Sequence, residues 1–215
     1  MPLQLILTSV SDNLTNAWRR FCGNYPGVQI YQGSILDVPC DAVVSPANSF
    51  GFMDGGIDAL YTHTFGPIVQ HRLRTVIRDV YGGELLVGQA EVVETSNPNI
   101  PYLIAAPTMR VPMILSDSVH PYLAARAVLR LALHGRFQHG KLLGEPVRDH
   151  IQRVAMPGLG TGVGQVSPNV CARQVAQAIE DVLLGNYTEP STWAEASERH
   201  QLLYTSRPKR LQASK

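Results

Sequence analysis

The sequence predicts an α/β protein, a three-layer α/β/α sandwich with a mixed, largely parallel central sheet. Short apolar segments typical of strands alternate with amphipathic helical segments from the start of the chain. Two of the predicted strands run directly into glycine-containing loops that are followed by helices. Strand and helix alternation of this kind packs as a largely parallel sheet covered by helices.

Each element has its own local signal. Alternating or continuous apolar residues predict strands at 3–7, 28–31, 41–44, 90–93, 102–106 and 151–156. Helical spacing and capping residues predict helices from Ser11 to about residue 21, after residue 56, from Pro67 to a stop at Gly82, at 121–134, and from the cap Ser167 onward. The regular pattern weakens beyond Gly185. We therefore expect one domain at 1–185 and a surface extension at 186–215.

Composition limits the classes of function. With 45% apolar and 16% charged residues among 215, the chain has the composition of a globular protein, without the ~20 consecutive apolar residues of a membrane span. The N-terminus lacks a secretory signal, so a cytoplasmic location is expected. Three widely spaced cysteines indicate neither disulfides nor a zinc site, and we expect no metal or cofactor. The net charge of +1 argues against general nucleic-acid binding. Nothing in the pattern indicates an oligomeric state.

The most informative motif is the glycine run that follows the strand at 151–156. Glycines without Cβ atoms let successive backbone N–H groups converge on an anion, and the helix that begins after Ser167 adds its positive end. A flexible turn explains four alternating glycines poorly. The run therefore predicts a phosphate cradle, formed by Gly158, Gly160, Thr161, Gly162, Val163 and Gly164.

A second motif follows the predicted strand at 41–44. Ala47 and Asn48 come at the end of the strand, then Gly55, Gly56 and Ile57, then Asp58 at the start of a helix. Asn48 offers a donor and an acceptor, as a ribose diol requires, and Asp58 could orient or deprotonate a water. Taken alone, Asp58 is a typical residue for a helix start, favoured by the helix dipole.

These two motifs resemble those of the macro domains, which bind ADP-ribose. The segment from Ser45 to Asp58 aligns without a gap to the family's signature, and the 158–164 run resembles its second loop, so the resemblance covers roughly residues 3–184. It implies that Asn48 contacts the distal ribose and that Asp58 positions water in hydrolytic members. It also implies that Gly55, Gly56 and Ile57 face that ribose and its phosphate, that Thr161, Gly162 and Val163 bind the diphosphate, and that Ser34 and Ile35 meet the adenine.

This chain departs from the family at five positions. Ser34 replaces the usual aspartate at the adenine end, and Ser45-Pro46 replaces the first Asn-Ala pair. Asp54 interrupts the glycine run, where a carboxylate near phosphate is unfavourable unless it turns outward. Gly164 stands where an aromatic residue often packs against the distal ribose, which would leave room for a larger substrate.

The expected function is binding of ADP-ribose and its hydrolysis from a mono-ADP-ribosylated macromolecule, with Asn48 and Asp58 as catalytic residues. Three alternatives remain open at this point: a reader module that does no chemistry, a phosphatase acting on ADP-ribose 1″-phosphate, and an unrelated nucleotide-binding fold. Two lesser signals remain. The segment at 135–142 differs from a P-loop motif by one residue, but it follows a helix rather than a strand. His120 is a candidate for lining the nucleotide pocket.

Overall fold

A computed structural model describes residues 3–210 of the chain. Its centre is a six-stranded sheet in the order β2-β1-β6-β3-β5-β4. The pairs are parallel except for β4 with β5, which confirms the mixed, largely parallel sheet. The strands are β1 (Gln4–Ser9), β2 (Val28–Gln32), β3 (Ala42–Ser45), β4 (Glu91–Glu94), β5 (Tyr102–Ala105) and β6 (Arg153–Met156).

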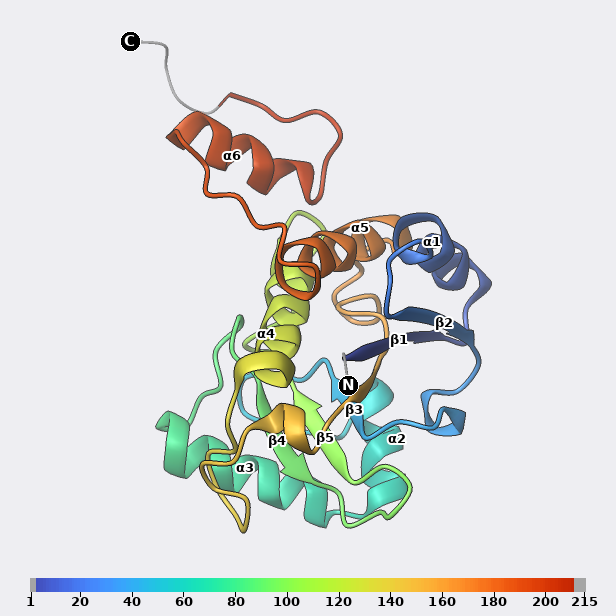
Figure 1. The fold of residues 1–215 in the computed structure, drawn as a ribbon, viewed down its shortest axis with the longest axis vertical. Helices are drawn as coiled ribbons and strands as arrows, with labels where there is room; N and C mark the ends of the chain where they lie inside the picture. The colour runs from blue at the N-terminus through green and yellow to red at the C-terminus, as the bar shows by residue number, and fades with distance from the viewer. Residues whose placement is uncertain (1–2, 211–215) are drawn as a thin grey trace.

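Helices cover both faces of this sheet and complete the predicted sandwich (Figure 1). One face carries α1 (Asp12–Cys22), α4 (His120–His134) and α5 (Pro168–Ala178), and the other carries α2 (Gly56–Phe65) and α3 (Ile68–Tyr81). Within residues 3–210, none of the helices has both the length and the apolar character needed to cross a bilayer.

Alternation along the strands divides the core into two layers. Leu5 and Leu7 of β1 pack on the side of α1, α4 and α5, whereas Ile6 faces α2 and α3. On β3, Val44 faces the first layer and Val43 the second. Successive strand residues point to opposite faces, so Ser45 is directed toward the α2 and α3 layer.

The strand order places the functional loops at one edge of the sheet. β6 lies between β1 and β3 and is parallel to both, so the segments that follow these three strands leave the sheet side by side. Ligands of open α/β sheets bind beyond the carboxyl ends of the strands. This edge therefore carries the candidate site.

The C-terminal extension contains a helix that the sequence analysis did not predict. α6 (Trp193–Leu202) begins at Thr192, whose side chain accepts from the Glu195 backbone N–H, while the Glu195 carboxylate accepts from Ser191. This reciprocal arrangement resembles a capping box, a signal that is visible in the sequence as Thr-x-x-Glu. Figure 1 shows α6 standing away from the sheet.

Candidate functional site

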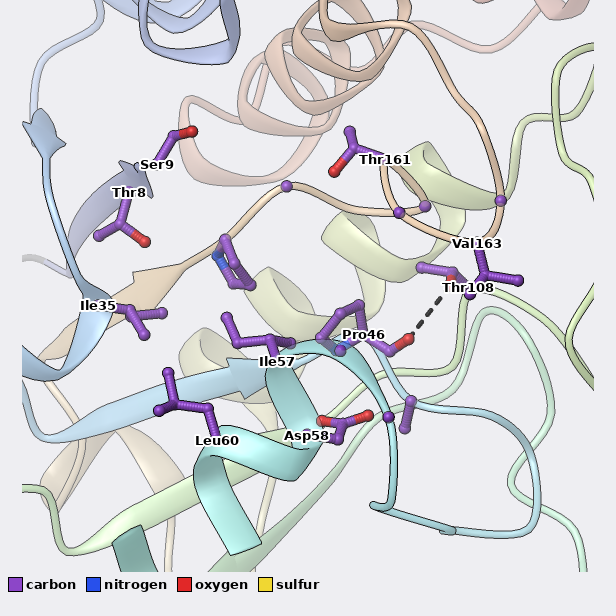
Figure 2. A pocket seen from close by; sticks show the side chains of 18 of the residues that line it. Thr8, Ser9, Ile35, Pro46, Ile57, Asp58, Leu60, Thr108, Thr161 and Val163 are labelled. Atoms are coloured by element: carbon purple, nitrogen blue, oxygen red, sulfur yellow. Dashed lines mark hydrogen bonds between the residues drawn. The ribbon is translucent and has the colours of Figure 1, made fainter. Parts of the chain in front are cut away.

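A cleft of about 620 Å³ opens at this edge of the sheet (Figure 2). Thr161 and Val163 lie on one side of it, with Pro46, Ile57 and Asp58 across from them. All thirteen ligand-binding residues expected from the sequence line this one cleft, namely Ser34, Ile35, Ala47, Asn48, Gly55, Gly56, Ile57, Gly158, Gly160, Thr161, Gly162, Val163 and Gly164. The two motifs thus face each other across a single hollow.

In the 158–164 loop three backbone carbonyls are engaged in hydrogen bonds, whereas, among the described residues 3–210, the N–H groups of residues 160–164 are not. The carbonyls of Gly160, Gly162 and Gly164 accept hydrogen bonds from Val166, Gln165 and Leu115, at 3.0, 3.0 and 2.8 Å. In the part of the chain that the structure describes, the N–H groups of residues 160–164 donate to no other group. Convergent N–H groups without partners form a concavity suited to an anion.

Two glycines of this loop are required by the space around them. A Cβ on Gly164 would lie 2.6 Å from the Gly160 carbonyl oxygen, and one on Gly158 would lie 2.5 Å from Thr161 Oγ1. Gly162, by contrast, has open space where a side chain would point. An aromatic residue at 164 would therefore clash with the backbone of this loop.

The opposite wall of the cleft begins at the N-terminus of α2. Gly55 precedes the helix and contributes no side-chain cap, so the first N–H groups of α2 have no partner within the helix. The same groups carry the positive end of the helix dipole. Gly55 and Gly56 have no heavy atoms within 4 Å of an added Cβ, so the backbone here is open to a ligand.

Asp58 lies in the first turn of α2 and is buried, with 8% of its surface exposed. Its Oδ1 accepts a hydrogen bond of 2.5 Å from the fully buried Ser45 hydroxyl at the end of β3. Burial raises the pKa of Asp58 to about 6, and the bond from Ser45 opposes this rise. The carboxyl group is therefore largely ionised at pH 7 but close enough to its pKa to exchange a proton.

Asn48 lines the cleft, but much of its side chain is engaged by its own loop. Oδ1 accepts from the backbone N–H groups of Phe50 and Phe52, at 3.1 and 3.3 Å, and Nδ2 donates to the Phe52 carbonyl at 2.8 Å. An amide carries two acceptor lone pairs and two N–H donors, so one N–H remains. In this loop conformation Asn48 can donate to a ribose hydroxyl but cannot accept from one.

The far end of the cleft contains Ser34 and Ile35. Ser34 Oγ accepts from Leu36 N at 3.3 Å and caps the short helix Ile35–Asp37, while Ile35 is buried against the sheet. The Ser34 hydroxyl keeps its proton for donation. Asp54 lines the cleft and is exposed to solvent.

The structure adds lining residues that the sequence analysis missed. They come from the end of β1 and the start of α1, from the loops after β3, β5 and β6, and from α2: Thr8, Ser9, Val10, Ser11, Leu14, Phe52, Leu60, Thr108, Met109, Pro112 and Pro157. The position of Thr8 and Ser9 at a strand end was the available signal. His120 is not among the lining residues; its Nδ1 lies 2.8 Å from the Thr108 carbonyl oxygen, so it supports the cleft from behind.

The fold and the cleft define an α/β/α sandwich whose strand ends surround a nucleotide-sized hollow with free backbone amides. The chain belongs to the macro domain family, because a model of the Macro domain matches residues 44–175. This match excludes an unrelated nucleotide-binding fold. The matched region lies within the 3–184 stretch on which the sequence resemblance was based.

Sequence relatives and solved structures agree with this assignment. A protein of Aquifex aeolicus is 30% identical over 71% of this chain and 80% of its own length, and a macro domain-containing protein of Vibrio parahaemolyticus is 28% identical over the same shares. The macrodomain of Mycobacterium tuberculosis DarG has a TM-score of 0.55 at 20% identity, over 70% of this chain and 88% of its own. A variant of the Oceanobacillus iheyensis macrodomain, solved with ADPR, has a TM-score of 0.56 at 16% identity, over 70% and 75%.

Proposed function

We propose that this cleft binds ADP-ribose and that Asp58 promotes hydrolysis of ADP-ribose from a mono-ADP-ribosylated macromolecule. One observation carries the proposal: residues 160–164, whose N–H groups have no partner within the described residues, line the same cleft as the N-terminus of α2. A diphosphate between these two walls receives hydrogen bonds from both. The Oceanobacillus iheyensis variant and a Trypanosoma brucei macrodomain, both solved with the ligand, support the choice of ADP-ribose.

The remaining parts of the nucleotide follow from this placement. The adenine lies toward Ser34 and Ile35, and the distal ribose lies toward Asn48 and Asp58, as the resemblance to the family implies. Both pairs line the cleft, and Figure 2 shows Ile35 and Asp58 apart within it. The free N–H of Asn48 donates to a hydroxyl of the distal ribose. Backbone N–H groups supply most of the binding, so no metal or other cofactor is part of the proposal.

Hydrolysis then requires a water beside the anomeric carbon of the distal ribose. Asp58, with a substrate phosphate, holds this water. The water oxygen bonds to the anomeric carbon, the bond from that carbon to the acceptor breaks, and the proton released by the water reaches the acceptor. The N–H groups of the two loops stabilise the negative charge that accumulates.

A calorimetric titration with ADP-ribose tests the binding. The sharp comparison is Gly162→Glu against Gly162→Gln, because position 162 has open space and the two side chains differ in charge but hardly in shape. A carboxylate beside the diphosphate is expected to weaken binding at least about tenfold more than the amide does. Equal affinities for the two variants would contradict a diphosphate in this loop.

Turnover is tested separately, on acceptors that carry ADP-ribose through ester, ether, N-glycosidic and phosphoester linkages. Asp58→Asn is expected to retain binding and to lose most of the release of ADP-ribose, while Asp149→Asn, an exposed carboxylate outside the cleft, retains both. Binding without release from any linkage would identify a reader module. Release of inorganic phosphate from ADP-ribose 1″-phosphate as the only reaction would identify a phosphatase.

Two further assignments belong to the same proposal. Cys22, Cys40 and Cys171 are free and buried, as expected in a reducing compartment, and we place the protein in the cytoplasm. We place the domain boundary near residue 185, where the positive φ of Gly185 ends the last helical turn after α5.

A further inference from the structure

Two more hollows adjoin the ADP-ribose cleft in series over α3. Phe52 lines both the cleft and a second hollow of about 540 Å³. His71 and Thr75 of α3 line that hollow and also a third one of about 360 Å³. Because neighbouring hollows share lining residues, the two further hollows lie next to one another along α3, and one of them lies next to the cleft. We call these two further hollows the α3 path.

The α3 path collects positive charge in a chain that is nearly neutral overall, at +1. Arg74 and Arg78 line the second hollow, and Arg72 and Lys141 line the third. Glu94 is the one carboxylate among the residues that line these two hollows. Arg78 pairs with its neighbour Asp79, whereas Arg72, Arg74 and Lys141 form no ion pair within the described residues 3–210.

Aromatic rings lie where the α3 path meets the cleft. Phe50 and Phe52 line the second hollow, and Phe52 is 44% exposed. The guanidinium of Arg74 stacks over the Phe52 ring at 4.3 Å from its centroid. Arginine held against an exposed aromatic ring combines a phosphate-binding charge with a surface on which a base can stack.

The segment that resembles a P-loop forms one wall of the third hollow. His139, Gly140, Lys141 and Leu142 all line it, and Figure 1 shows this loop reaching down beside α3. The loop is held in place because His139 Nε2 donates to the Val92 carbonyl at 2.8 Å. Lys141 of this segment therefore lines the α3 path. The segment follows a helix, so it cannot form a nucleotide-binding P-loop.

We propose that the α3 path binds a single-stranded nucleic acid, whose phosphates contact Arg74, Arg72 and Lys141 and one of whose bases stacks on Phe52. Spaced cations bind any polyanion, and the exposed ring at the mouth of the cleft adds a surface on which an unstacked base can lie. The acidic side chains of a peptide have no aromatic face for that position. The inference rests on the proposed function in one respect: the nucleic acid is then the macromolecule that carries the ADP-ribose. Binding of the nucleic acid to the α3 path does not depend on that role.

The test measures fluorescence anisotropy of a labelled single-stranded DNA oligonucleotide with the full chain, without ADP-ribose. Arg74→Glu with Lys141→Glu changes one cation in each of the two outer hollows. The control, Arg130→Glu with Arg207→Glu, makes the same change of net charge on α4 and in the C-terminal tail, outside all three hollows. Thermal melting checks that both variants fold as the wild type does.

The α3 path variant is expected to bind the oligonucleotide at least about tenfold more weakly than the wild type. Loss of two phosphate contacts is expected to lower the slope of log affinity against log salt by about 1.4, at about 0.7 for each contact with a single strand. The control variant is expected to bind as the wild type does. No binding by the wild type, or an equal loss in both variants, would overturn the proposal. A loss in the control alone would also overturn it and would place the contact on α4 or the tail. Competition by polyglutamate as strong as by unlabelled DNA would also overturn it, in favour of an acidic peptide. The calorimetric titration with ADP-ribose is independent of all these outcomes.

Discussion

The hydroxyl of Ser45 donates a hydrogen bond of 2.5 Å to Oδ1 of Asp58, and both side chains are buried. Ser45 ends β3 and Asp58 lies in the first turn of α2, so the bond joins the sheet to the helix at the point where the cleft opens. Ser45 is also one of the positions at which this chain departs from the family signature. The departure places a hydroxyl beside the proposed catalytic carboxylate.

Ser45 is expected to set the pH range in which Asp58 works. Its hydrogen bond lowers the pKa of Asp58, so Ser45→Ala raises that pKa further above about 6. The ionised form then requires a higher pH, and the acid limb of the pH–rate profile moves upward by about one unit, equivalent to about 1.4 kcal/mol. Ser45→Thr, which keeps a hydroxyl, is expected to restore the wild-type limb. A profile that does not move in Ser45→Ala would contradict this role.

Asp58 is expected to make the native state less stable at neutral pH. Its pKa is 3.8 in a model peptide and about 6 in the folded chain, so the native state binds the proton more tightly. The contribution of Asp58 to stability therefore falls as pH rises from about 4 to about 6, by roughly 3 kcal/mol in all. Asp58→Asn removes this dependence.

Urea denaturation of the wild type and of Asp58→Asn measures the effect at about pH 4.5 and about pH 7.5. Asp58→Asn should gain stability relative to the wild type at the higher pH. Asp149→Asn, whose carboxylate is exposed, serves as the control. The same difference between wild type and Asp58→Asn at both pH values would show that burial does not shift this carboxyl group.

The glycines of the 158–164 loop are expected to differ sharply in their tolerance of alanine. Gly164→Ala places a methyl group 2.6 Å from the Gly160 carbonyl oxygen, so the loop must move, with an expected loss of about 1–3 kcal/mol of unfolding free energy and of affinity for ADP-ribose. Gly162→Ala meets no atom within 4 Å and should change both quantities little. Calorimetry measures the affinity of the two variants for ADP-ribose, and thermal melting measures their stability. Similar losses in Gly162→Ala and Gly164→Ala would show that the loop packs differently.

Asn48 is expected to serve the loop and the ligand with different atoms. Asn48→Ala removes the acceptor of the Phe50 and Phe52 N–H groups and should lower both stability, by about 1 kcal/mol, and affinity for ADP-ribose. Asn48→Asp keeps an acceptor oxygen for those N–H groups but has no N–H to donate. It should therefore lose affinity while it retains more of the stability than Asn48→Ala does. Wild-type affinity in Asn48→Asp would contradict donation to the ribose.

Local patterns were sufficient to predict most of the elements and both loops. The alternation of strand and helix patterns, the glycine run after β6 and the capping residues Ser167 and Pro168 all act over a few residues, so they are readable from the chain. The helix α6 was missed although Thr192 and Glu195 carry a capping signal, because the apolar periodicity around them is weak.

By itself, the sequence determined the order of the elements, the two glycine-containing loops and the chemistry available at Asn48 and Asp58. Only the tertiary structure decided that β6 lies between β1 and β3, which brings Thr8 and Ser9 into the cleft, and that Ser45 meets Asp58. It also decided that Lys141 stands beside Arg72 in one hollow. The reason is physical: backbone preference and capping act between near neighbours, whereas strand order and side-chain pairing depend on the packing of segments far apart in the chain.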